Sequence, residues 1–158
     1  MDRTYKYQLE FTKTTLLLVL LGSFSAQAFC IYFYGKVLEL DLSEFWGYFL
    51  AFSLSISEIL LYYAMIFNAK RYYNRSAIAV EAQLGDCKNN KSEIQKKLEA
   101  LSLIEEEATW RSIGSCNLFF IITFIAFTFA IGNVQLNLAY VYSAIGASIT
   151  TLALSLFL

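Results

Sequence analysis

The sequence predicts an all-α integral membrane protein with four transmembrane helices and a cytoplasmic antiparallel helical hairpin between the second and third helices. Of its 158 residues, 58% are hydrophobic and only 16% are charged. Soluble domains are about 45–50% apolar and about 25% charged. A chain this short has too much surface for its volume to hide the excess apolar side chains from water. The lengths of four apolar stretches and the placement of basic residues between them define the rest of the architecture.

Four apolar stretches are each long enough to cross the hydrocarbon core, which takes about 20 helical residues. They cover residues 14–34, 45–67, 113–131 and 138–158, and Glu58 in the second is the one charged residue among them. Because hydrocarbon offers the backbone no hydrogen-bond partners, each stretch is predicted to be a helix. The chain then divides into residues 1–67 with two spans, 68–112 with the hairpin, and 113–158 with two further spans.

Basic residues indicate the orientation of these spans. The N-terminal segment and the middle segment carry eleven of the twelve lysines and arginines, and the first loop carries only Lys36. The last loop, residues 132–137, carries no charge. Since basic segments are retained on the cytoplasmic side, a multi-pass protein is predicted with both termini and the middle segment in the cytoplasm.

A cleaved signal peptide is an alternative interpretation of the N-terminus. Lys13 is followed by an apolar run and then by Ala26-Gln27-Ala28, which has the pattern of a cleavage site. The apolar run continues well past that pattern. This continuation favours a first span that is retained.

The middle segment is predicted to form two antiparallel helical arms. Its apolar side chains repeat at the four-three spacing of a coiled-coil seam. The seam residues are Tyr73, Ala77, Val80 and Leu84 in the first arm, and Ile94, Leu98 and Leu101 in the second, which continues to Glu105 and Ala108. Residues 85–91 have the composition of a turn. Because seams this short bury little surface, the hairpin is either a stiff connector or a stalk that oligomerises or docks a partner.

Charged residues surround the two arms. The basic residues beside the predicted membrane surface are Lys70, Arg71, Arg75 and Arg111. They either contact anionic lipid headgroups or only fix the topology. The acidic run Glu105-Glu106-Glu107 is expected to be a solvated face.

Polar residues deep in the first two spans are the candidate intramembrane site. Glu58 lies near the middle of its span, with Ser57 beside it and Tyr62 one turn further on, and Gln27 lies at a similar depth in the first span. A bare carboxylate in hydrocarbon is costly, so Glu58 is expected to be protonated or paired. One interpretation is a Glu58–Gln27 hydrogen bond that joins two helices. The other is an ion or proton path lined by Glu58.

Side-chain size distinguishes the remaining spans. Small residues recur every four positions at Gly22 and Ala26 in the first span and at Ala139, Ser143, Ala147, Thr151 and Ser155 in the fourth. Such stripes let helices approach closely, either within one subunit or between subunits. The third span instead carries bulky side chains around its girth, at Phe119, Phe120, Phe124, Phe127 and Phe129. It is therefore expected to be largely lipid-facing.

Several classes of function are disfavoured by what the sequence lacks. Histidine is absent, and Cys30, Cys87 and Cys116 do not have the spacing of a disulfide framework or a zinc site. No phosphate-binding, dinucleotide-binding or hydrolase motif occurs. The net charge of −1 gives no basic field for nucleic acid. We therefore expect a non-enzymatic protein with no catalytic residues, no metal, no cofactor and no nucleic-acid partner.

Two functions fit what is left, and both place the protein in a lipid bilayer. In the first, the chain self-associates as a homo-oligomer that forms or controls a membrane pore, and the hairpin is the element for assembly or sensing. Glu58 and the hydroxyl-rich faces of the second and fourth spans favour this function. In the second, the chain is a membrane-anchored adaptor or immunity-type inhibitor that binds a cytosolic or membrane protein without conducting. The hairpin seams and the short outer loops favour that alternative.

Overall fold

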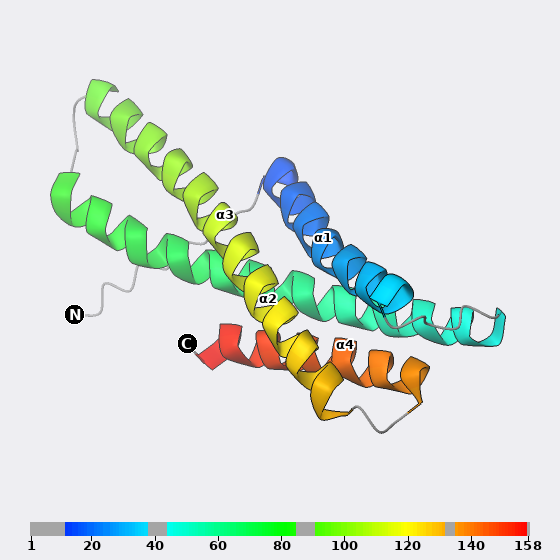
Figure 1. The fold of residues 1–158 in the computed structure, drawn as a ribbon. Helices are drawn as coiled ribbons and strands as arrows, with labels where there is room; N and C mark the ends of the chain where they lie inside the picture. The colour runs from blue at the N-terminus through cyan, green and yellow to red at the C-terminus, as the bar shows by residue number, and fades with distance from the viewer. Residues whose placement is uncertain (1–11, 38–43, 85–90, 132–134, 158) are drawn as a thin grey trace.

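The computed structural model describes residues 12–37, 44–84, 91–131 and 135–157, and this part of the chain is helical (Figure 1). The helices are α1 (Lys13–Val37), α2 (Glu44–Leu84), α3 (Lys91–Ala130) and α4 (Leu136–Phe157). All four are long and apolar enough to cross a membrane. An all-helical chain with four candidate transmembrane helices is thus confirmed. Insertion into a bilayer and the side on which each segment lies stay predictions.

Two helices are much longer than a single span. α2 has 41 residues and α3 has 40, so each is about 60 Å long at 1.5 Å per residue. The hydrocarbon core is roughly 30 Å thick. Each helix therefore continues without a break from its apolar stretch into the polar middle segment, as the sequence predicts. Of the predicted turn at residues 85–91, only Lys91, where α3 begins, lies within the described residues.

The long helices form the centre of the fold. α2 and α3 run antiparallel and cross, and both contact α1 as well as α4 (Figure 1). At the core, the ring of Tyr34 lies edge-on to the rings of Phe124 and Tyr140, with centroid distances of 5.5 and 4.9 Å. Phe120 stacks on Phe124 at 6.0 Å. This aromatic cluster connects α1, α3 and α4.

The expectation that the third span is largely lipid-facing is wrong for two of its phenylalanines. Phe120 and Phe124 are fully buried, whereas Phe129 is 77% exposed. The two buried rings are four residues apart and therefore share one face of α3. That face packs in the same core as Ala144 and Ala147 of α4. Bulky side chains on one helix fill the space that small residues leave on the next.

The small-residue stripe of α4 lies inside this single chain. Its members Ala139, Ser143, Ala147, Thr151 and Ser155 are all buried. On α1, Ala26 is also buried, and a Cβ added to Gly22 would lie 2.7 Å from Ile113 Cγ2 on α3. Both stripes are therefore used for packing between helices of one subunit.

The two arms of the middle segment contact each other next to the apolar stretches. The buried cluster there is Tyr73, Ala77 and Ala108, flanked by Tyr72, Leu101 and Ile104. The placement of Leu98 in the seam is wrong, because this side chain is 63% exposed. A four-three-four repeat counted back from Ala108 passes through Ile104, Leu101 and Lys97 and skips Leu98. The predicted seam and the observed one share Leu101 and Ala108, so spacing alone did not distinguish them.

Beyond that cluster the arms separate. Figure 1 shows α2 and α3 diverging toward Leu84 and Lys91. Val80 is half-buried, and the predicted seam side chains of Leu84 and Ile94 lie outside the described residues. The contact between the described parts of the arms is therefore concentrated where they leave the apolar stretches.

The start of α1 is fixed by a cap and by a contact with α3. Thr12 Oγ1 accepts a hydrogen bond from the Thr15 backbone N–H at 3.2 Å, which is the geometry of an N-cap. Thr15 Oγ1 donates to Glu105 Oε1 at 3.0 Å. Glu105 is half-buried, so the expectation of a fully solvated acidic run is wrong at this residue. The contact aligns the first turn of α1 with the polar half of α3.

Candidate intramembrane polar site

Polar side chains from α1, α2 and α4 meet around adjacent residues of α2. Successive residues of an α-helix point about 100° apart, so Ser57 and Glu58 face different neighbours. Ser57 faces α4, where its Oγ lies 2.5 Å from Ser148 Oγ and 3.3 Å from the Ala144 carbonyl oxygen. Glu58 faces α1, where its Oε1 accepts a hydrogen bond from Ser23 Oγ. Two neighbouring positions of α2 thereby connect three helices.

Gln27 contributes the amide of this network. Its Nε2 donates to Ser57 Oγ at 2.6 Å, and the side chain is only 3% exposed. The predicted Glu58–Gln27 hydrogen bond is not formed through Gln27 Nε2 or Glu58 Oε1, because Gln27 Nε2 donates to Ser57 and Glu58 Oε1 accepts from Ser23. The pair of helices was predicted correctly but the pairing of side chains was not, since one step along a helix changes the direction of a side chain by about 100°.

Gln27 and Glu58 nevertheless line the same groove. It lies between α1 and α2 and has a volume of about 380 Å³. The other lining residues are Phe24, Ala28, Ile31, Leu54, Ser55 and Ile59. Phe24, Ile31 and Ile59 are 42–55% exposed, so the groove opens on the outer surface of the bundle. Glu58 thus borders an apolar opening on the face that the chain would present to lipid or to another subunit.

Two oxygen atoms in this site have no hydrogen-bond partner in the described part of the chain. They are Gln27 Oε1 and Glu58 Oε2. Buried polar atoms are usually hydrogen-bonded, and each exception calls for an explanation. The fourth sequence candidate, Tyr62, is half-buried and packs edge-on against Tyr63 at 5.9 Å. It does not line the groove.

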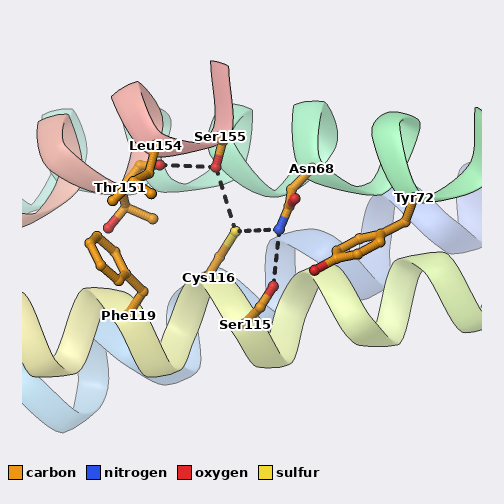
Figure 2. Close-up of a pocket in the computed structure, with 8 residues that line it drawn as sticks. All are labelled: Asn68, Tyr72, Ser115, Cys116, Phe119, Thr151, Leu154 and Ser155. Atoms are coloured by element: carbon orange, nitrogen blue, oxygen red, sulfur yellow. Dashed lines mark hydrogen bonds between the residues drawn. The ribbon is translucent and has the colours of Figure 1, made fainter. Parts of the chain in front are cut away.

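A second polar cluster lies near the end of α4 and was not predicted. It surrounds a pocket of about 230 Å³ between α2, α3 and α4 (Figure 2). Asn68 Nδ2 donates to Ser115 Oγ at 3.0 Å and approaches Cys116 Sγ at 3.5 Å. Cys116 Sγ lies 3.9 Å from Ser155 Oγ. Asn68 directly follows the apolar stretch 45–67, and its position at that boundary was the available signal.

Asn117, like Ser23 and Ser148, is a polar residue of the helix contacts that was not among the predicted candidates. Its Nδ2 donates to the Gly22 carbonyl oxygen at 2.9 Å and approaches Ser25 Oγ at 3.3 Å. The absence of a side chain at Gly22 lets α3 approach α1 closely enough for this bond. An asparagine within an apolar stretch was the signal, because such a side chain needs a partner on a neighbouring helix.

The basic residues at the predicted membrane surface have different surroundings. Arg71 Nη2 donates to the Leu156 carbonyl oxygen at 2.9 Å and so caps the last turn of α4. Arg111 forms an exposed ion pair with Glu107 at 3.0 Å. Lys70 and Arg75 are exposed. Arg71 therefore has a structural role within the chain, and a role in lipid binding is a proposal for the other three.

Neither a metal site nor a relative defines the activity. Within residues 12–37, 44–84, 91–131 and 135–157, no group of three or more cysteine or acidic side chains is placed to hold a metal ion. Comparison with models of protein families and with curated proteins finds no match. The functional argument therefore rests on the polar site itself.

Proposed function

We propose that this protein is a non-enzymatic, multi-pass membrane protein that self-associates and forms or controls a membrane pore. The observation that carries the proposal is the position of Glu58, whose side chain lines a groove that opens on the outside of the bundle. A carboxyl group at this depth is costly against lipid. Contact between copies at the α1–α2 face would move Glu58 away from lipid and toward an axis shared by the subunits.

The internal packing of the chain supports this choice of surface. The small-residue face of α4 is already buried against α2 and α3. The α1–α2 face carries large exposed apolar side chains, including Phe24, Phe52 and Ile59. In lipid, association depends on shape and polar contacts rather than on hydrophobicity. A groove with a polar floor provides both.

In the proposed orientation, both termini and the hairpin are cytoplasmic. The sequons at Asn74 and Asn90 test this orientation, because residues 74–76 and 90–92 read Asn-Arg-Ser and Asn-Lys-Ser. Expressed in a host that glycosylates lumenal sequons, both sites should stay unmodified. A glycan on either one would place the hairpin on the opposite side and refute the orientation.

The pore proposal is tested by reconstitution of the purified chain into liposomes. We expect cation flux and, in mild detergent, a mass that corresponds to several copies. Glu58→Gln keeps the shape of the side chain and removes its ionisation, so it should strongly reduce the flux. Glu106→Gln, an exposed acidic residue of α3, is the matched control and should leave the flux unchanged. A strictly monomeric protein without flux would refute the proposal.

An adaptor or inhibitor is the second candidate, and exposed side chains of the hairpin favour it. Leu98 and Leu103 are 63% and 67% exposed on the polar half of α3. Five helical positions turn the side-chain direction by about 140°, so the two leucines offer two separate apolar contacts to a partner rather than one patch. A protein partner that is retained by the wild-type chain and lost from Leu98→Ser together with Leu103→Ser, in a preparation without flux, would support this function over the pore.

A further inference from the structure

The two unpartnered oxygens in the α1–α2 groove point to a ligand. Gln27 is fixed by the donation of its amide nitrogen to Ser57, and this leaves Gln27 Oε1 as an acceptor without a donor in the described chain. Glu58 is fixed by the hydrogen bond from Ser23 to its Oε1, and this leaves Glu58 Oε2 as a second acceptor without a donor in the described chain. Gln27 is 97% buried. Both side chains line one groove, and both oxygens are buried beneath it with no donor from the described part of the chain.

A single positive charge held between the two side chains would satisfy both oxygens. A proton on Glu58 Oε2 turns this atom into a donor, and a neutral carboxyl is far less costly in an apolar site than a carboxylate. A small metal cation would instead be bound by the carboxylate and the amide oxygen together, since both are hard oxygen ligands. We propose that Glu58 and Gln27 form a binding site for one monovalent cation, H⁺ or Na⁺, which enters through the groove between α1 and α2.

The charge of the site selects a monovalent ion. Glu58 is the one titratable group that lines the groove in the described chain. Cys30 on α1 and Tyr62 on α2, the titratable groups nearest in sequence to Gln27 and Glu58, do not line it. One carboxylate neutralises one positive charge, so a divalent ion would leave a net charge in apolar surroundings. This inference deepens the proposed function, because it names the ions that the pore would bind at Glu58.

Chemical labelling of Glu58 tests the site without any need for a pore. Dicyclohexylcarbodiimide is an apolar reagent that reaches carboxyl groups in lipid-facing grooves and reacts with the protonated form. The acid proton moves to a nitrogen of the reagent, the carboxyl oxygen adds to its central carbon, and an acyl shift to nitrogen gives a stable N-acylurea. The full chain in mild detergent is treated over a pH series, in choline chloride or in NaCl at equal ionic strength. Mass spectrometry of peptides then locates the adduct.

We expect an adduct at Glu58 whose yield falls as pH rises and the carboxyl ionises. Labelling that depends on pH alone assigns the site to H⁺. Labelling that NaCl suppresses relative to choline chloride at the same pH assigns it to Na⁺ as well, because the bound ion replaces the proton. A folded protein in which Glu58 stays unlabelled at every pH, while a water-soluble carbodiimide labels exposed carboxyls such as Glu106 in the same preparation, overturns the proposal.

Substitutions of the neighbours have opposite expected effects on the labelling midpoint. Gln27→Leu removes the acceptor for a protonated Glu58. The pH at which labelling is half-maximal should therefore fall, so that about five- to tenfold more protons are needed for the same labelling. Ser23→Ala removes a donor to the carboxylate and should raise the midpoint by a similar factor. Ser53→Ala is the matched control, since buried Ser53 donates only to Leu50 of its own helix. Equal midpoints and equal Na⁺ effects in wild type and Gln27→Leu would refute the role of Gln27.

The labelling experiment tests the cation site and the flux experiment tests the pore, so either proposal can be refuted while the other is kept. Labelling of Glu58 with the expected shifts, in a chain that gives no flux, keeps the cation site and refutes the pore. Flux that survives Glu58→Gln, in a chain whose Glu58 never reacts, refutes the site and keeps the pore. Circular dichroism and gel filtration of each variant show that it is folded before it is labelled.

Discussion

The close approach of α1 to α3 at Gly22 predicts a large effect of a very small substitution. In Gly22→Ala, the new Cβ would lie 2.7 Å from Ile113 Cγ2 and 3.2 Å from Ile113 Cγ1. Carbon atoms at optimal contact are about 3.5–4.0 Å apart. Ile113 is β-branched and is held near one χ1 rotamer in a helix, so its methyl group cannot turn away. The helices must therefore separate, and this strains the Asn117 bond to the Gly22 carbonyl oxygen.

The expected magnitude is the balance of two effects. Overpacking a buried contact costs about 1–3 kcal/mol, and replacing a helical glycine with alanine recovers about 1 kcal/mol. Gly22→Ala should therefore lower the free energy of unfolding by about 0–2 kcal/mol. Gly114→Ala is the matched control, because nothing lies within 4 Å of its added Cβ. This control should instead be about 1 kcal/mol more stable than wild type.

The assay is reversible unfolding in mixed micelles at increasing SDS fraction, followed by circular dichroism. The two alanine variants should differ by about 1–3 kcal/mol. Adding Ile113→Ala removes the clash, so a double-mutant cycle between Gly22 and Ile113 should give a favourable coupling of about 0.5–3 kcal/mol. Equal stabilities of Gly22→Ala and Gly114→Ala, or zero coupling in the cycle, would refute the close approach of the two helices.

Four further substitutions test hydrogen bonds by the same unfolding assay. Tyr34→Phe removes a donor to Thr128 at 3.0 Å and should lower the free energy of unfolding by about 1 kcal/mol. Tyr140→Phe removes a buried hydroxyl that has no partner in the described chain, so the stability should be unchanged or higher. The reverse order would contradict the observed hydrogen bonds. Ser57→Ala leaves the Gln27 amide and Ser148 without their shared partner and should lower the free energy of unfolding by about 1–3 kcal/mol. An unchanged unfolding midpoint would show that the network adds no stability. Arg71→Leu removes the cap on α4 and should cost about 0.3–1 kcal/mol, an effect that disappears if the bond to the last turn does not form.

Properties that depend on the local sequence could be predicted, and properties that depend on the rotation of one helix against another could not. The apolar stretches and their continuation into two long helices depend on the composition of each segment. The burial of Phe124 and the pairing of Gln27 with Ser57 depend on which face of a helix is turned inward. A step of one residue changes that face by about 100°. The sequence therefore located Glu58 and Gln27 on neighbouring helices without giving their partners.

The residues at the contact between the two hairpin arms could not be predicted from one arm alone. Two four-three repeats pass through Leu101 and Ala108, and the observed one continues through Ile104. Only the contact with Tyr73 and Ala77 on the opposite arm distinguishes them. Periodicity in one arm defines a set of possible seams, and the other arm selects among them.

The unbroken length of α2 has a mechanical consequence. This helix continues from Glu44 to Leu84 and contains no proline, the commonest cause of a sharp kink. Contacts with α3 at Met65, Asn68 and Ala77 hold this straight helix along the stretch between Glu58 and the polar middle segment. A displacement of the polar half of α2 would therefore have to carry α3 with it before it could change the width of the α1–α2 groove.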